Sequence, residues 1–142
     1  PAGSDPSFAA VNMLGPIFGN DPSGRLYKSL VETKKATSVA GYAMDLHDPS
    51  LIMFVCEVPR DKSLDDARDT MIHTVEQSLR EKPITQEEVD RVRRMQLKAR
   101  ELAASNISSL AIELSEWASM GDWRLYFLNR DRIEAVTVED VQ

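Results

Sequence analysis

Two neighbouring strand-like segments, placed in a sequence otherwise patterned for helices, most constrain the fold of this 142-residue chain. Residues Ser38–Asp45 and Leu51–Val58 have strand character, and the turn-forming run His47–Ser50 joins them as a hairpin. Because Leu51–Val58 is almost wholly apolar, we predict that this strand is central and buried on both faces. A hairpin alone is marginally stable in water, so we expect further strands from sequence before Pro1 and after Gln142.

Apolar residues at helical spacing, together with helix-capping residues, predict that the rest of the chain is mostly helical. The expected helices cover residues 6–19, 25–33, 64–81, 85–120 and 123–135. As one straight helix, residues 85–120 would span about 54 Å, so we expect a bend or break at Ala104–Ser109. The predicted fold is α+β, a partial antiparallel sheet with a central hairpin, covered on one side by helices.

Both ends of the sequence have the character of cuts in a longer chain. Thr137 and Asp140 form a capping-box-like helix start, but only two residues follow Asp140. A helix of a single turn is unstable by itself because nucleation is costly. We therefore expect residues 1–142 to be one α+β domain, a fragment of a longer multi-domain chain. Separated from its neighbours, such a fragment would expose sheet edges and tend to self-associate.

Charge and cysteine content exclude several classes of partner and site. The net charge of −6 argues against nucleic acid or an anionic membrane as the main partner. The basic run 91–100 also contains acidic residues, and we interpret it as a solvated helix face. The single cysteine, Cys56, excludes an intrachain disulfide and predicts a small buried thiol in the strand. The compartment stays open between cytoplasm and periplasm.

The two histidines do not form a recognisable metal motif. His73-Thr74-Val75-Glu76-Gln77 resembles the inverted zinc motif H-x-x-E-H, but Gln77 stands where the second imidazole is required. His47 lies in the hairpin turn with no second histidine near it in sequence. Templates for serine hydrolases, P-loop enzymes and dinucleotide-binding proteins are absent. We predict no catalytic residue, no metal ligand and no cofactor in this fragment.

Two tryptophans flank the joint Met120-Gly121-Asp122. Trp117 and Trp123 have two interpretations that the sequence leaves open. They lock the two adjoining helices together, or they form an exposed surface for packing against a neighbouring domain. The loop Asn20–Gly24 is interpreted as structural, because the carboxylate of Asp21 opposes anion binding.

The order of these segments resembles the insulinase/pitrilysin-type zinc metallopeptidases, the inverzincins. Residues 19–30 are similar to that family's glycine/serine loop followed by R-L-x-x-x-L, here Arg25, Leu26 and Leu30. Residues 31–39 resemble its L-R-E-K-x-G-L-A-Y-x-V segment. Residues 109–117 and 121–123 look like late helices of large bacterial members, and residues 1–4 like the end of the preceding strand. The resemblance covers nearly the whole chain.

The resemblance implies a clamshell-like peptidase in which homologous domains of the LuxS/mitochondrial-processing-peptidase-like type enclose a chamber for peptides. Zinc would lie in the parent protein's first domain, and this chain resembles the second, non-catalytic domain. Active members also carry an Arg and a Tyr, in a later domain, that hold the substrate. Val31 stands at the Arg position, and Ala36-Thr37, one residue shorter, at the Tyr region, so this pair is not carried over.

The resemblance therefore implies a non-catalytic, chamber-forming domain of a zinc-dependent metalloendopeptidase. Its partners would be the catalytic domain, the other domains of the parent chain and a peptide substrate, with Lys34 and Lys35 as candidate substrate contacts. The alternative is a proteolytically inactive scaffold or chaperone-like subunit built on the same domain. A free-standing helical interaction module is disfavoured by the cut ends. An intact H-x-x-E-H before Pro1 would distinguish the first two.

Overall fold

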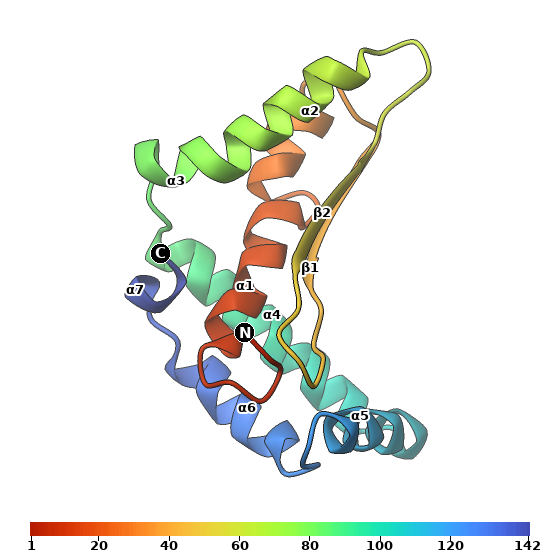
Figure 1. The fold of residues 1–142 in the computed structure, drawn as a ribbon, viewed down its shortest axis with the longest axis vertical. Coiled ribbons are helices and arrows are strands. Elements are labelled where there is room, and N and C mark those ends of the chain that lie inside the picture. Colours follow the sequence, from red (N-terminus) through yellow and green to blue (C-terminus); the bar gives the residue numbers. More distant parts are fainter.

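In the computed structural model, a central helix lies against one face of a two-stranded antiparallel sheet (Figure 1). The structure describes the backbone of residues 1–142 and every side chain except that of residue 78. The helix is α1 (Phe8–Gly19), and the strands are β1 (Ser38–Ala43) and β2 (Ile52–Glu57). The register pairs Ser38 with Glu57 and Ala43 with Ile52. The α+β class and the hairpin are confirmed.

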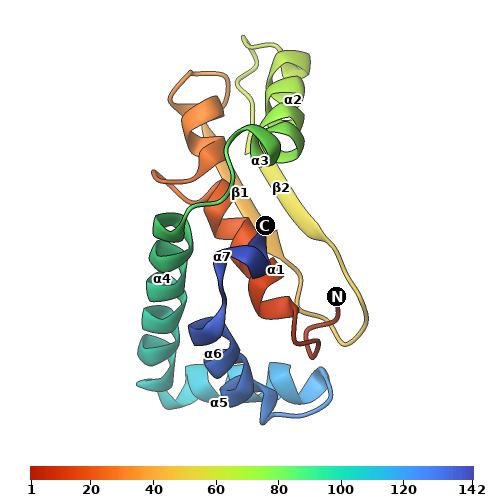
Figure 2. The ribbon, with the colours of Figure 1, turned by 90° about the vertical axis from the view of Figure 1, so that its left-hand side faces the viewer.

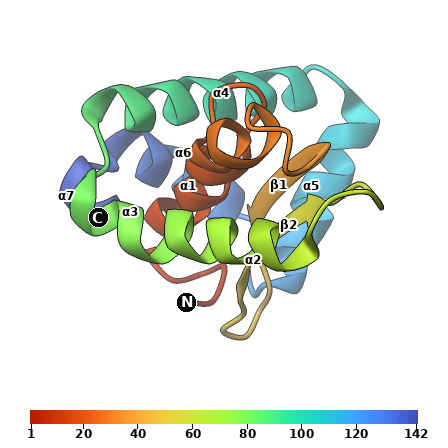
Figure 3. The same ribbon diagram turned by 90° about the horizontal axis from the view of Figure 1, so that it is seen from above.

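The remaining elements are helical and surround α1. They are η1 (Tyr27–Val31), α2 (Leu64–Ile72), η2 (His73–Gln77), α3 (Ser78–Glu81), α4 (Gln86–Ala104), α5 (Ile107–Ser119), α6 (Leu125–Ala135) and α7 (Val138–Val141). Seen from above, α1 lies between α4 on one side and the α2–α3 arm on the other (Figure 3). No helix among those described is long and apolar enough to cross a bilayer.

Glycines allow α1 and β1 to approach at backbone distance. A Cβ atom added at Gly15 would come within 2.7 Å of the Gly41 carbonyl oxygen, and one added at Gly41 would come within 2.6 Å of the Gly15 oxygen. Neither distance is compatible with an unshifted backbone. The absence of side chains at these two positions therefore sets the close packing of the helix on the sheet.

The main core forms where α1 meets the sheet, α4 and the end of the chain. Its most deeply buried side chains are Met13, Ile17, Phe18, Leu26, Leu30, Val89 and Val92. A smaller cluster of Trp117, Met120 and Tyr126 lies between α5 and α6. Figure 2 shows α4, α5 and α6 grouped around the end of the molecule where α1 begins.

Several helix boundaries follow the capping signals, whereas α1 and α6 each begin two residues later than predicted, without a side-chain cap. Thr85 with Glu88, and Thr137 with Asp140, both form complete capping boxes. The expected break is confirmed: α4 ends at Ala104, and the side chain of Asn106 accepts a hydrogen bond from the Ser109 amide at 3.0 Å. These boundaries depend on contacts between residues three positions apart, which explains why the sequence predicts them.

Three expectations need correction. The second strand is not buried on both faces: no residue of β2 is fully buried, and Val55 is 42% exposed. The reason is that α1 covers only the face carrying Phe54 and Cys56. Cys56 is accordingly only partly buried, although burial raises the pKa of its thiol. The segment 25–33 forms a π-helical turn at Tyr27–Val31 rather than a regular α-helix.

An arginine fork fixes the turn after α1 to the start of α4. Arg25 donates from Nε and Nη2 to the two carboxylate oxygens of Glu88, each at 2.8 Å, and to the carbonyl oxygens of Lys82 at 2.7 Å and Pro83 at 3.0 Å. Burial would raise the pKa of Glu88, but hydrogen bonds from Arg25 and Thr85 and the charge of Arg25 lower it to about 2. The R-L-x-x-x-L segment thus has a structural role here.

Candidate functional site

Neither histidine belongs to a group of metal ligands. His47 lies in the exposed loop between the strands, with Nδ1 3.2 Å from Oδ1 of Asp48. His73 is exposed at the start of η2, and the π-helical turn places it differently from the α-helical H-x-x-E-H arrangement. In the part of the chain that the structure describes, no group of three or more His, Cys, Asp and Glu side chains could hold a metal ion. The residues present therefore do not fit a zinc ion.

The two lysines proposed as substrate contacts differ in their surroundings. Lys35 directs its ammonium at α2, where Nζ donates to Oδ1 of Asp66 at 3.0 Å and to Oγ1 of Thr70 at 2.8 Å. Lys34 is exposed and has a positive φ of 60°. The charge of Lys35 thus serves to attach the turn after η1 to α2. A contact between either lysine and a substrate stays a prediction.

The two tryptophans also have different surroundings. Trp117 is buried in the small cluster with Met120 and Tyr126, so it packs α5 against α6 within this chain. Trp123 is 50% exposed, and its ring lies edge-on to Phe127 with centroids 6.1 Å apart. Trp117 therefore locks the two helices together, as one of the two interpretations proposed. Packing against a neighbouring domain stays a prediction, and of the two tryptophans only Trp123 has a ring exposed enough for it.

A polar cavity of about 240 Å³ lies among α1, α4, α5 and α6. Its polar lining consists of Asn12, Asp45, Gln96, Arg100, Glu113 and Asn129. Helical spacing explains how it forms: Gln96 and Arg100 are four residues apart on α4, and Asn129 and Ile133 are four apart on α6, so each pair shares one face. We name it the four-helix cavity.

Three residues that line the four-helix cavity each have a side-chain atom that is buried away from solvent and has no hydrogen-bond partner. Asn129 is only 3% exposed, and its Oδ1 is unpaired. Gln96 directs Nε2 at the carbonyl oxygen of Asn12, at 3.5 Å, which leaves its Oε1 unpaired. The Nε of Arg100 is also unpaired. More than nine-tenths of buried polar groups in proteins are satisfied, so these three atoms, close to one another between α4 and α6, are unusual.

The guanidinium of Arg100 packs against two aromatic rings. Its guanidinium lies 4.1 Å from the ring centroid of Tyr126 and 6.0 Å from that of Trp117, and it also donates to the Tyr126 carbonyl oxygen. Burial lowers the pKa of Arg100, while Tyr126 and Glu113 act in the opposite direction. A buried cation of this kind gains from an acceptor at its unpaired Nε.

The interpretation of residues 91–100 as a solvated face is therefore wrong for three of the arginines. Arg91 has its Nε and Nη2 buried without a hydrogen-bond partner. Arg100 packs on Tyr126 of α6, and Arg93 reaches the end of α6, where it donates to the carbonyl oxygens of Ile133, at 3.3 Å, and Val136. Carbonyl groups at a helix C-terminus lack hydrogen-bond donors within the helix, and here an arginine from a neighbouring helix donates to them. The pattern of charges along α4 does not reveal that α6 packs beside it.

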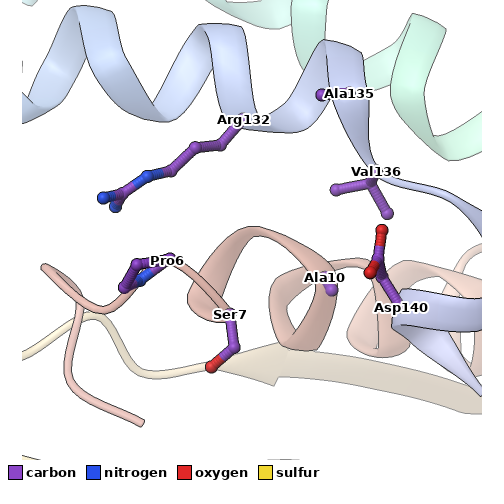
Figure 4. A pocket seen from close by; sticks show the side chains of 7 residues that line it. All are labelled: Pro6, Ser7, Ala10, Arg132, Ala135, Val136 and Asp140. Carbon is purple, nitrogen blue, oxygen red and sulfur yellow. The ribbon is translucent and has the colours of Figure 1, made fainter.

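A second hollow, of about 390 Å³, lies between the start of α1 and the α6–α7 segment (Figure 4). Arg132 extends across it toward Pro6 in Figure 4 and donates from Nη1 to the Ser4 carbonyl oxygen at 3.0 Å. Asp140 accepts from the amide of Thr137 at 2.8 Å. Both charged side chains thus already have partners. None of the unpaired buried atoms belongs to a residue that lines this hollow.

The motif patterns did not single out Asn129 or Gln96. The signal that could have found Asn129 is its position on the apolar side of α6, three residues after Tyr126 and four before Ile133. A polar residue on a buried helix face must be satisfied by a partner, a water or a ligand. Gln96 has no comparable signal, because its neighbours on α4 are mixed in polarity.

Comparisons with known proteins place this fold among peptidase domains. A family model described as the peptidase M16 inactive domain matches residues 1–96. The structure of the inactive peptidase domain of a candidate zinc protease from Bordetella parapertussis is 40% identical, with a TM-score of 0.92. It covers 100% of this chain, which in turn covers 77% of it. A candidate zinc protease from Bordetella pertussis Tohama I is 39% identical, with a TM-score of 0.90 and coverages of 100% and 78%.

A protease from Helicobacter pylori shares the fold at 20% identity, with a TM-score of 0.88 and coverages of 99% and 34%. Comparison with curated proteins gave no match. Four of the polar or aromatic residues that line the four-helix cavity, Arg100, Glu113, Trp117 and Asn129, follow the segment that the family model matches.

Proposed function

The chain belongs to the family of peptidase M16 inactive domains, and from this premise we propose that it is a non-catalytic, chamber-forming domain of a zinc-dependent metalloendopeptidase that acts on peptides. The observation that carries the proposal is the match to an inactive domain, together with 40% identity over the whole chain to a domain of the same description. In this proposal, zinc and the hydrolytic chemistry belong to another domain of the parent protein, and no step runs through a metal on this chain.

Exposed apolar side chains support a role in packing against other domains. Trp123 and Phe127 form an edge-to-face pair on α6, and each is about half exposed. Aromatic residues of this kind dominate the binding energy of protein interfaces when a partner desolvates them. We therefore assign the Trp123–Phe127 pair to contact with a neighbouring domain of the parent.

The face of the hairpin opposite α1 supports a role as a chamber wall. Tyr42 and Val55 alternate with the inward-facing residues of the strands and are 45% and 42% exposed. Leu51 continues this surface at the end of the hairpin and is 54% exposed. An open sheet face with apolar and aromatic side chains is suited to contact with unfolded peptides, which offer apolar side chains of their own.

The experiment uses the zinc-bearing domain of the parent, expressed separately and mixed with this chain. We expect the two proteins to associate, and peptide cleavage by the zinc-bearing domain to rise when the chain is added. The double variant Trp123→Ala, Phe127→Ala should weaken association about thirtyfold, the typical effect of losing an interface hot spot. The matched control is Leu64→Ala, because Leu64 is 70% exposed at the start of α2, at the opposite end of the molecule from α6 (Figure 1).

The outcomes separate the competing roles. Cleavage of peptides by this chain alone, abolished by a zinc chelator, would contradict the non-catalytic assignment. Association without any cleavage by the assembled parent would favour the inactive scaffold. An unchanged affinity in the double variant would place the domain contact elsewhere on the surface.

A further inference from the structure

No further inference is drawn: the strongest candidate, the outer edge of strand β2 in the two-stranded sheet, carries none because nothing in the structure shows what covers it.

Discussion

Replacing Glu88 with glutamine removes one charge from the arginine fork while keeping the size of the side chain. The side chains of Arg25 and Glu88 are only 13% and 15% exposed, so solvent screens the pair weakly. The pKa of Glu88 falls from 4.5 to about 2 in the fold. At 1.36 kcal/mol per pKa unit, this difference corresponds to about 3 kcal/mol of folding free energy at pH 7.

The sign of the pH dependence follows from the lowered pKa. Above the unfolded value of 4.5, Glu88 is charged in both states, and its full contribution is present. As the pH falls through 4.5 toward about 2, the unfolded chain takes up its proton first, and the contribution decreases. The difference between the unmodified chain and Glu88→Gln should therefore shrink from about 3 kcal/mol at pH 7 to about 2 kcal/mol at pH 3.5.

Urea denaturation of both proteins at pH 7, 4.5 and 3.5 measures this difference directly. The matched control is Asp131→Asn, which breaks the exposed pair between Arg130 and Asp131, 2.7 Å apart, and should change stability far less. A difference for Glu88→Gln that is independent of pH over this range would refute the reasoning. So would a destabilisation at pH 7 no larger than that of Asp131→Asn.

Three further predictions concern packing and reactivity. Gly41→Ala should lower the free energy of unfolding by about 2 kcal/mol or more in urea, because the new Cβ would meet the backbone of α1; a neutral result would contradict the close approach. Leu30→Ala should cost about 2–5 kcal/mol in the same assay, and Leu64→Ala far less, because only the first side chain is fully buried. Burial raises the pKa of Cys56, so its thiol should react with a disulfide reagent at pH 8 more slowly than free cysteine, and unfolding in urea should restore the rate; equal rates in the folded and unfolded chain would disprove this.

Local hydrogen bonding made three of the helix starts predictable. Thr85, Asn106 and Thr137 each accept from an amide three residues later, so the partners that define these boundaries lie within one helical turn in the sequence. The hairpin was predictable for a similar reason: its two strands are adjacent in sequence, and the turn at residues 47–50 brings them together. The ordered segments that resemble the insulinase-type peptidases also lie along the chain, and the family match bears that resemblance out.

The candidate site depends on residues that are far apart in sequence. The four-helix cavity joins Asn12 of α1 to Asn129 of α6, and no local pattern encodes that approach. The directions of Arg93 and Arg100 likewise depend on where α6 lies beside α4.

The amino-acid sequence by itself thus determined the class of fold, most helix ends and the family, because these depend on interactions between near neighbours along the chain. Tertiary structure alone decided which polar groups are buried without partners and which face of β2 meets solvent. The physical reason is that desolvation depends on every element packed around a group, whichever part of the chain supplies it.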